Sequence, residues 1–381
     1  MQYRKFGKHD IEVSLLGFGA MRLPILDGDE AKIDEDRAIE MIRYAIDHGV
    51  NYVDTAYPYH KGSSEYLVGK ALKDGYRERV FLATKSPVWL VESHDDFERF
   101  LDEQLQKLDT DRIDMYLLHA LNKKRWEKVR NLNAFEFLEK AREEGKIRYI
   151  GFSFHDDFQA FREIIDSYDW DFCQIQLNYM DEHYQAGVRG LKYAGSKNIA
   201  VIIMEPLKGG KLARPPERVK KIFEESGRDW SPVEWAFRWV GNFKEVSVIL
   251  SGMSTLEQVM DNVRIMDRIL PNSLAEEDLN TIRKVQNCYR DMMLINCTEC
   301  GYCMPCANGV DIPGIFRLYN EAHIYNALED AKRAYQWFQN DRKDASQCIE
   351  CGDCEKVCPQ RLKIRELLKK VDKELKTVED A

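Results

Sequence analysis

Apolar residues in the first part of the chain gather in short runs that are rich in β-branched and aromatic side chains. Each run is apolar almost throughout and does not alternate with polar residues, which is typical of parallel strands covered on both faces. Eight runs predict strands, and they begin at Val13, Asn51, Val80, Ile113, Ile147, Phe172, Ala200 and Val246.

Amphipathic stretches with helical spacing separate these runs. In residues 37–48, six apolar residues share one face of a helix, and Gly49 is a residue that commonly ends a helix. The predicted helices cover residues 37–48, 64–73, 96–107, 134–144, 158–165, 184–195, 233–239 and 256–265. Eight strand–helix pairs over about 270 residues predict an α/β fold, a (β/α)8 TIM barrel. Segments 3–6 and 11–13 predict a small hairpin that closes the barrel floor.

A doubly wound nucleotide-binding sheet is the competing fold. Its fingerprint is G-x-G-x-x-G between the first strand and the first helix. Residues 17–22 read GFGAMR, so the third glycine is missing, and no helix begins there. The pattern therefore favours the barrel.

Polar side chains end three consecutive predicted strands. Asp54 ends the second strand and is followed five residues later by Tyr59, while Lys85 and His119 end the third and fourth strands. A single polar strand end is more often a cap or a solvated terminus. Because the chemistry of such barrels lies at the C-terminal ends of the strands, we expect these four side chains to converge on one mouth.

The segments DTAYPYHKGSSEYLVGKAL, FLATK, IDMYLLHA and GKIRYIGFSFH resemble the aldo-keto reductases, and the resemblance covers about residues 1–270. It implies an NAD(P)H-dependent oxidoreductase that reduces an aldehyde or ketone by reversible hydride transfer. Hydride transfer builds negative charge on the carbonyl oxygen, which requires an acid. Tyr59 is the expected proton donor, and Lys85 the cation that lowers its pKa from about 10. Asp54 holds Lys85, and His119 orients the carbonyl.

The same resemblance implies a nicotinamide cofactor and the residues that bind it. Ser153 and Gln174 hold the carboxamide, although Phe154 follows Ser153 where the family usually has asparagine. Met204 stands where an aromatic side chain usually stacks on the nicotinamide. The expected cofactor-binding residues are Gly19, Met21, Ser153, Gln174, Met204, Leu207, Gly209, Lys211, Gly252, Ser254, Gln258, Asp261 and Asn262.

Within that set, Leu207, Gly209 and Lys211 are expected at the pyrophosphate, and Asp261 and Asn262 at the adenine. Gly252 and Gln258 occupy the positions where basic residues would hold a 2′-phosphate. Family habit favours NADP(H) and these residues weaken that preference, so both NADP(H) and NAD(H) stay open.

Eight of the ten cysteines lie in the 62 residues from Cys297 to Cys358. The second run has the pattern C-x2-C-x2-C-x3-C-P of bacterial ferredoxins, in which the last cysteine ligates the other cluster. Zinc sites usually use two C-x2-C pairs, so continuous triplets favour iron–sulfur clusters. The predicted ligands of two 4Fe-4S clusters are Cys297, Cys300, Cys303 and Cys358 for one, and Cys348, Cys351, Cys354 and Cys306 for the other.

The chain therefore divides, in our interpretation, into a barrel domain over residues 1–290 and a ferredoxin-type domain over residues 291–381. Helical patterns at 312–325 and 328–338 separate the two cysteine runs, which predicts a small α-helical ferredoxin-like two-cluster domain. The remaining cysteines, Cys173 and Cys288, are expected to be core thiols.

The composition of the chain argues against two classes of partner, nucleic acids and membranes. The 381 residues carry a net charge of −9 without a basic block, which argues against nucleic-acid binding. No apolar run approaches the ~18 residues of a membrane helix, and the N-terminus lacks the apolar core of a signal peptide. We expect a cytoplasmic protein acting on a small carbonyl substrate. Selectivity is expected from loops 120–133 and 208–231, and the former is a basic segment typical of a solvated face, or able to attract an anionic substrate.

The alternative function is an electron-transfer protein, in which the iron–sulfur domain exchanges electrons with a redox partner protein or with the barrel site. A nicotinamide gives two electrons as hydride and each cluster takes one, so direct coupling normally needs a flavin. No flavin-binding signature is visible in the sequence, which favours the carbonyl reductase.

Overall fold

The computed structural model describes residues 1–376, whose packing forms two compact units. The first unit comprises residues 1–212 and 230–275, and the second comprises residues 213–229 and the chain from residue 276 onward. Helix α11 (Glu276–Asp291) packs with the second unit. The domain boundary at residue 290 remains a prediction.

Eight parallel strands close into a barrel in the order β10-β3-β4-β5-β6-β7-β8-β9. Each predicted apolar run contains one of these strands, so the TIM barrel is confirmed. Their bounds are β3 (Leu16–Gly19), β4 (Tyr52–Asp54), β5 (Phe81–Ser86), β6 (Ile113–Leu121), β7 (Ile147–Phe154), β8 (Phe172–Gln176), β9 (Ala200–Met204) and β10 (Val246–Gly252).

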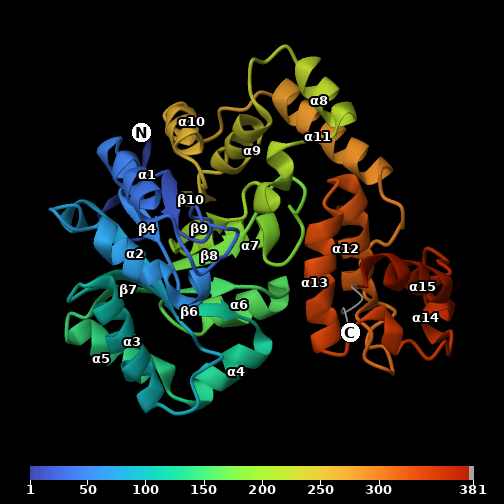
Figure 1. Cartoon of the computed structure of the whole chain (residues 1–381), viewed down its shortest axis with the longest axis horizontal. Helices are drawn as coiled ribbons and strands as arrows, with labels where there is room; N and C mark the ends of the chain where they lie inside the picture. The colour runs from blue at the N-terminus through green and yellow to red at the C-terminus, as the bar shows by residue number, and fades with distance from the viewer. Residues whose placement is uncertain (377–381) are drawn as a thin grey trace. The chain divides into compact units, whose positions relative to one another are not determined.

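Helices surround the barrel strands (Figure 1). Several begin at a side-chain cap that their sequence supplies, such as Asp34 before α1, Asp157 before α6 and Thr255 before α10. The helices of this unit are α1 (Glu35–Asp47), α2 (Ser64–Ala71), α3 (Asp95–Leu108), α4 (Lys123–Asn131), α5 (Ala134–Glu143), α6 (Phe158–Asp166), α7 (Gly187–Ser196), α9 (Pro232–Gly241) and α10 (Leu256–Met266).

An antiparallel hairpin of β1 (Tyr3–Lys5) and β2 (Glu12–Ser14) closes the floor of the barrel, as predicted. Phe6 and Val13 are fully buried in the cluster that fills the barrel interior. Gly7 between the strands has φ 54°, and a Cβ there would lie 2.5 Å from the carbonyl oxygen of Asn198, which precedes β9. Only glycine fits this close approach of hairpin and strand end.

The second unit is helical. It contains α8 (Glu217–Glu224), α11, α12 (Ile312–Ile324), α13 (Leu328–Asn340), α14 (Asp353–Lys356) and α15 (Ile364–Leu375). Helix α12 packs against both α13 and α15 (Figure 1). Their shared core includes Phe316, Tyr335 and Leu368, and six of the eight clustered cysteines pack against it. The two helices predicted between the cysteine runs are α12 and α13.

Two helices lie in segments predicted as loops, α4 within 120–133 and α8 within 208–231. Each buries only two apolar side chains, Trp126 and Val129 in α4, and Val219 and Phe223 in α8. Two apolar positions among many charges are too few to establish a helical period in the sequence. Within residues 1–376, no helix has the length and apolar character needed to cross a membrane.

Candidate active site and cysteine-lined cavities

The ends of three neighbouring strands bring Asp54, Lys85 and His119 together, and the turn after β4 adds Tyr59. Lys85 Nζ donates to Asp54 Oδ1 at 2.7 Å and lies 3.3 Å from the Tyr59 hydroxyl oxygen. The rings of Tyr59 and His119 meet edge to face with centroids 6.2 Å apart. The four side chains expected at one mouth therefore lie together there.

Lys85 is fully buried, so its charge depends on its partners. Besides Asp54 and Tyr59 it donates to the carbonyl oxygen of Thr55 at 2.7 Å. Burial acts to lower the pKa of Lys85, but Asp54 and Tyr59 outweigh it and the pKa lies above 10.5. Burial raises the pKa of Asp54, which Lys85 opposes. At 2.7 Å the two groups form a charged pair whose field is directed at the Tyr59 hydroxyl.

The protonation of Tyr59 and His119 follows from their surroundings. The expected lowering of the pKa of Tyr59 is wrong: burial raises this pKa above 10, and the Lys85 cation only partly opposes the effect of burial. The Tyr59 phenol therefore carries its proton at neutral pH. Burial, reinforced by the charge of Lys85, lowers the pKa of His119 well below 6.5, so its imidazole is neutral. A neutral imidazole has one N–H to donate, and His119 Nδ1 has no partner within the described chain.

A bulge in β6 sets the direction of His119. The pairing of β6 with β7 shifts between Leu118 and Leu121, and Ala120 takes a left-handed φ of 54°. The Ala120 N–H donates to Ser153 Oγ at 2.7 Å, and Arg125 Nη1 donates to the Ala120 carbonyl at 2.8 Å. These two bonds hold a conformation that is costly for alanine.

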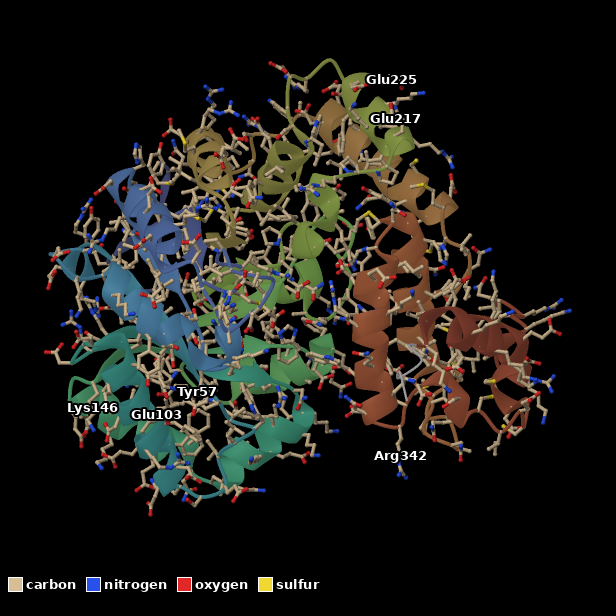
Figure 2. The ribbon with its side chains drawn as sticks, in the orientation of Figure 1. Tyr57, Glu103, Lys146, Glu217, Glu225 and Arg342 are labelled. Carbon is tan, nitrogen blue, oxygen red and sulfur yellow. The ribbon has the colours of Figure 1, made fainter. Side chains whose placement is uncertain are left out.

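The nearby Tyr57 is separate from this arrangement. Its hydroxyl donates to Glu103 Oε1 of α3 at 3.1 Å, and Figure 2 shows the two labelled side chains close together. Tyr57 therefore lies two residues before Tyr59, but its hydroxyl contacts a carboxylate and not Lys85.

Gln174 is the clearest candidate for a cofactor contact. It lies in β8, is 2% exposed, and its Oε1 has no hydrogen-bond partner within residues 1–376. Its Nε2 is 3.7 Å from Met204 Sδ. An unpaired buried carbonyl oxygen is costly unless a donor reaches it, and the amide of a nicotinamide is such a donor. Ser153 accepts from Ala120 N–H and retains its own hydroxyl proton to donate. Gln174 and Ser153 therefore fit the carboxamide of a nicotinamide.

The other expected cofactor residues lie in two loops. Gly209 and Gly210 adopt φ of 66° and 94° in the turn Lys208–Ala213 after β9, which also carries Lys211. Gly252 ends β10 and pairs with Gly19 of β3. In the turn that follows, Ser254 N–H donates to Gln258 Oε1 at 2.8 Å. Asn262 Nδ2 donates to Ser251 Oγ at 3.1 Å, and Asp261 is exposed beside Arg264.

Arg22 is a candidate that the sequence reasoning missed. Its carbonyl accepts from Ser254 Oγ at 2.7 Å, and its side chain lies over Gly252, where a Cβ would approach Arg22 Cγ to 2.8 Å. Arg22 Nη2 would be 3.9 Å from a Cβ on Gly209. The arginine thus lies between the two loops, in the space that Gly252 leaves. In the segment GFGAMR, the sequence predicts Gly19 and Met21 as cofactor-binding residues but does not identify Arg22.

The clustered cysteines surround two cavities. One, of about 250 Å³, is lined by Cys303, Cys306, Cys348, Cys351 and Cys354. The other is lined by Cys297, Cys300, Cys303 and Cys358. No three His, Cys, Asp or Glu side chains among residues 1–376 are close enough to hold one metal ion. The cysteines instead line two cavities, and each cavity has at least the four cysteine side chains that a cubane cluster requires as ligands.

The two cysteine loops also share their backbone. In each, the glycine after the second cysteine has a left-handed φ, 76° at Gly301 and 77° at Gly352. The glutamate before that cysteine is left-handed too, 53° at Glu299 and 58° at Glu350. Both loops thus turn in the same way around their cavities, and the donor set fits a cluster.

Comparisons with known proteins agree with both units. The aldo/keto reductase family matches residues 15–287, and a 4Fe-4S dicluster domain matches residues 296–362. L-galactose dehydrogenase of Arabidopsis thaliana is 28% identical over 310 residues, covering 75% of this chain and 94% of that protein. An NADH-specific methylglyoxal reductase of Escherichia coli (strain K12) is 26% identical over 330 residues, covering 73% and 96%.

Among solved structures, the holo form of an aldo-keto reductase from Bacillus halodurans is similar, with a TM-score of 0.63 and 27% identity. The match covers 75% of this chain and 96% of that one.

Proposed function

The chain belongs to the aldo/keto reductase family, and from that premise we propose that it is an NAD(P)H-dependent reductase of an aldehyde or ketone, with Tyr59 as proton donor. A nicotinamide cofactor, when bound, supplies the hydride for the carbonyl carbon. The observation that carries the proposal is the contact of the buried Lys85–Asp54 pair with the Tyr59 hydroxyl.

The side chains divide the proton chemistry among them. Tyr59 gives its phenolic proton to the carbonyl oxygen as negative charge develops there. Lys85 stabilises the phenolate that remains, and Asp54 keeps Lys85 charged and in place. His119, neutral and held by the Ala120 bulge, donates a hydrogen bond to the same carbonyl oxygen and fixes its direction.

The cofactor residues carry over from the family pattern. Gln174 and Ser153 would bind the carboxamide, with Met204 beside the nicotinamide ring. Leu207, Gly209 and Lys211 would contact the pyrophosphate, and Arg22 would add a positive charge that the family positions 252 and 258 do not supply. Arg22 does not occupy positions 252 or 258, where the family binds the 2′-phosphate. Its charge therefore supports the use of both NADP(H) and NAD(H).

The C-terminal part would hold two 4Fe-4S clusters with crossed ligation. Cys297, Cys300, Cys303 and Cys358 would hold one, and Cys348, Cys351, Cys354 and Cys306 the other. The two cavities support this division, because each is lined by one of these sets. Thiolate ligands persist in reducing compartments, in line with a cytoplasmic protein.

Electron transfer to a redox partner protein is the second candidate function. The observation that favours it is the exposure around the cysteine loops. Cys300 and Cys351 are exposed, and the large side chains Tyr302, Ile349 and Val357 beside them are 68%, 65% and 50% exposed. Apolar surface beside a one-electron carrier would suit a transient partner.

Replacing Tyr59 by phenylalanine tests the proposed reductase. Steady-state NAD(P)H oxidation would be measured with the holoenzyme against a panel of aldehydes and ketones, and cofactor affinity by fluorescence titration. Tyr59→Phe should lower kcat about 10²–10⁴-fold, the usual contribution of general acid catalysis. The Kd of the cofactor should change less than about threefold, since only the proton donor is lost.

Tyr57→Phe is the matched control, because it removes the same hydroxyl group two residues away. It should retain most of the activity. Equal losses in both variants, or a Tyr59→Phe enzyme with near-normal kcat, would refute the assignment of Tyr59.

A further inference from the structure

Helix α4 begins with an unusual charge pattern beside the active site. Its first three residues, Lys123, Lys124 and Arg125, are basic, and its first turn has no acidic residue. Cations at a helix N-terminus are opposed by the helix dipole, at a typical cost of about 0.3–1 kcal/mol each. The backbone is capped from outside, with Asp156 accepting from Lys123 N–H and Asn122 accepting from Arg125 N–H. The fold of the helix does not itself require these basic side chains.

Arg125 is the most constrained of the three. It is half-buried, and one guanidinium N–H donates to the Ala120 carbonyl at 2.8 Å. Its Cζ lies 5.4 Å from the centre of the Trp89 ring. No carboxylate lies within ion-pair distance of Arg125 in the described part of the chain. A partly desolvated cation with donors to spare and no counter-charge is costly unless a ligand supplies the anion.

The position of Arg125 connects it to the reacting groups. The Trp89 ring is close to both side chains, with its centroid 5.4 Å from Arg125 Cζ and 5.1 Å from the centroid of the His119 imidazole. The charge of Arg125 is also one of the causes that lower the pKa of His119. Arg125 and His119 thus share one neighbouring side chain, Trp89, which places the guanidinium near the site where the carbonyl oxygen is proposed to lie.

We infer that Arg125 determines the substrate class, by binding the anionic group of a carbonyl compound that carries a carboxylate or a phosphate. The inference rests on the proposed reductase function. The planar guanidinium matches both anions through paired N–H donors, and it gives specificity that a lysine would not. Exposed Lys123 and Lys124 add to the local positive potential that attracts such a substrate.

A purely structural role is the competing explanation, because Arg125 also supports the Ala120 bulge. Three aldehydes of similar shape separate the two: 4-carboxybenzaldehyde, its neutral methyl ester, and 4-formylphenyl phosphate. A structural role affects all three alike, whereas anion binding affects only the charged ones. The ratio of kcat/KM for the two anions identifies the preferred group.

The test compares Arg125→Gln with the wild-type holoenzyme. The wild type should prefer at least one anion over the ester about tenfold or more, and the variant should lose that preference, as expected for one charge-assisted contact. Loss of the contact with the Ala120 carbonyl should lower kcat/KM for all three aldehydes by a common factor, so the ratio of each anion to the ester reports anion binding. Arg130→Gln is the control, since Arg130 lies on the same helix and pairs with Glu163. It should keep the wild-type ratio.

A binding measurement keeps this inference separate from the reductase proposal. Titration calorimetry with 4-carboxybenzyl alcohol and its methyl ester would follow affinity without turnover. Tighter binding of the acid that Arg125→Gln abolishes would support the anion site, even if no aldehyde were reduced. Equal affinity for acid and ester in the wild type, or an equal loss of kcat/KM for all three aldehydes in Arg125→Gln, would overturn it.

Discussion

Lys85 is the buried cation that connects the other polar groups of the site. It is fully buried and contacts Asp54, the Thr55 carbonyl and the Tyr59 hydroxyl. The free energy of burying an ammonium group is offset only while these partners remain, and the same contacts direct its charge at Tyr59. Stability and activity therefore depend on the same residue.

Replacing Lys85 by methionine should affect both properties. With the opposing cation gone, the pKa of Tyr59 rises further and the phenolate is no longer stabilised, so kcat should fall by at least about 10²-fold. Asp54 is left as a buried carboxylate without a partner, which costs about 3–5 kcal/mol of unfolding free energy. Urea unfolding of the barrel and NAD(P)H oxidation would measure the two effects.

The pH dependence of the Lys85→Met variant gives an internal check. The unpaired Asp54 has a folded pKa above its unfolded value, so the folded state gains a proton as the pH falls. The destabilisation relative to wild type should therefore shrink between pH 8 and pH 5. Lys146→Met, at a half-buried lysine that pairs with Asp102, is the control, with an expected cost below about 1 kcal/mol. A loss that did not vary with pH would argue against a buried carboxylate.

At the scale of elements, the loops after β3, β9 and β10 carry residues that we propose to bind the cofactor. Arg22 of the first loop lies over Gly252 at the end of β10 and near Gly209 after β9. We propose that Arg22 contacts the pyrophosphate, which NADP(H) and NAD(H) share, whereas Gly252 and Gln258 bring no charge for a 2′-phosphate.

We therefore expect modest discrimination between NADPH and NADH. The ratio of their kcat/KM values should lie within about two powers of ten, or ~2.7 kcal/mol. Arg22→Ala should weaken the binding of both cofactors by a similar factor in fluorescence titrations. A discrimination several powers of ten larger, or an Arg22→Ala variant that lost affinity for only one cofactor, would mean that a residue reads the 2′ position.

The elements also show how far the sequence predicts this molecule. The eight strands were predicted because parallel strands buried on both faces give continuous apolar runs, and their polar ends located Asp54, Lys85 and His119. Helices α4 and α8 were missed because each buries only two apolar side chains. Arg22 was not identified as a site residue, because its importance depends on Gly252, which lies far away in the sequence. The basic segment that contains Arg125 was recognised as able to attract an anionic substrate, but Arg125 was not singled out, because its proximity to Trp89 and its bond to the Ala120 carbonyl follow from the fold.

At the scale of the whole molecule, the chain joins an aldo/keto reductase domain to a 4Fe-4S dicluster domain. The second unit has its own helical core, against which six of the cysteines pack. A small module of this kind usually depends on its bound clusters for stability. Exposure to air should therefore remove the brown colour of the protein before it affects the barrel.

Iron and acid-labile sulfide analysis of anaerobically prepared protein tests the two clusters. We expect about eight irons per chain, as two 4Fe-4S clusters require. Cys358→Ala should damage the cluster of the first cysteine run, because the predicted ligation is crossed. Cys288→Ala, at a buried cysteine outside both cavities, should keep the full iron content. Zinc instead of iron, or about four irons in the wild type, would contradict the assignment.

In the proposed reaction, the barrel transfers hydride directly to a carbonyl carbon, and the clusters lie outside that path. The most direct measurement is mass spectrometry of the alcohol formed in ordinary water from NAD(P)H that carries deuterium at both C4 positions. Direct transfer predicts about one deuterium per product molecule, on the carbinol carbon. If electrons passed singly through the clusters instead, the new hydrogen would come from solvent, and an alcohol without deuterium would contradict the account.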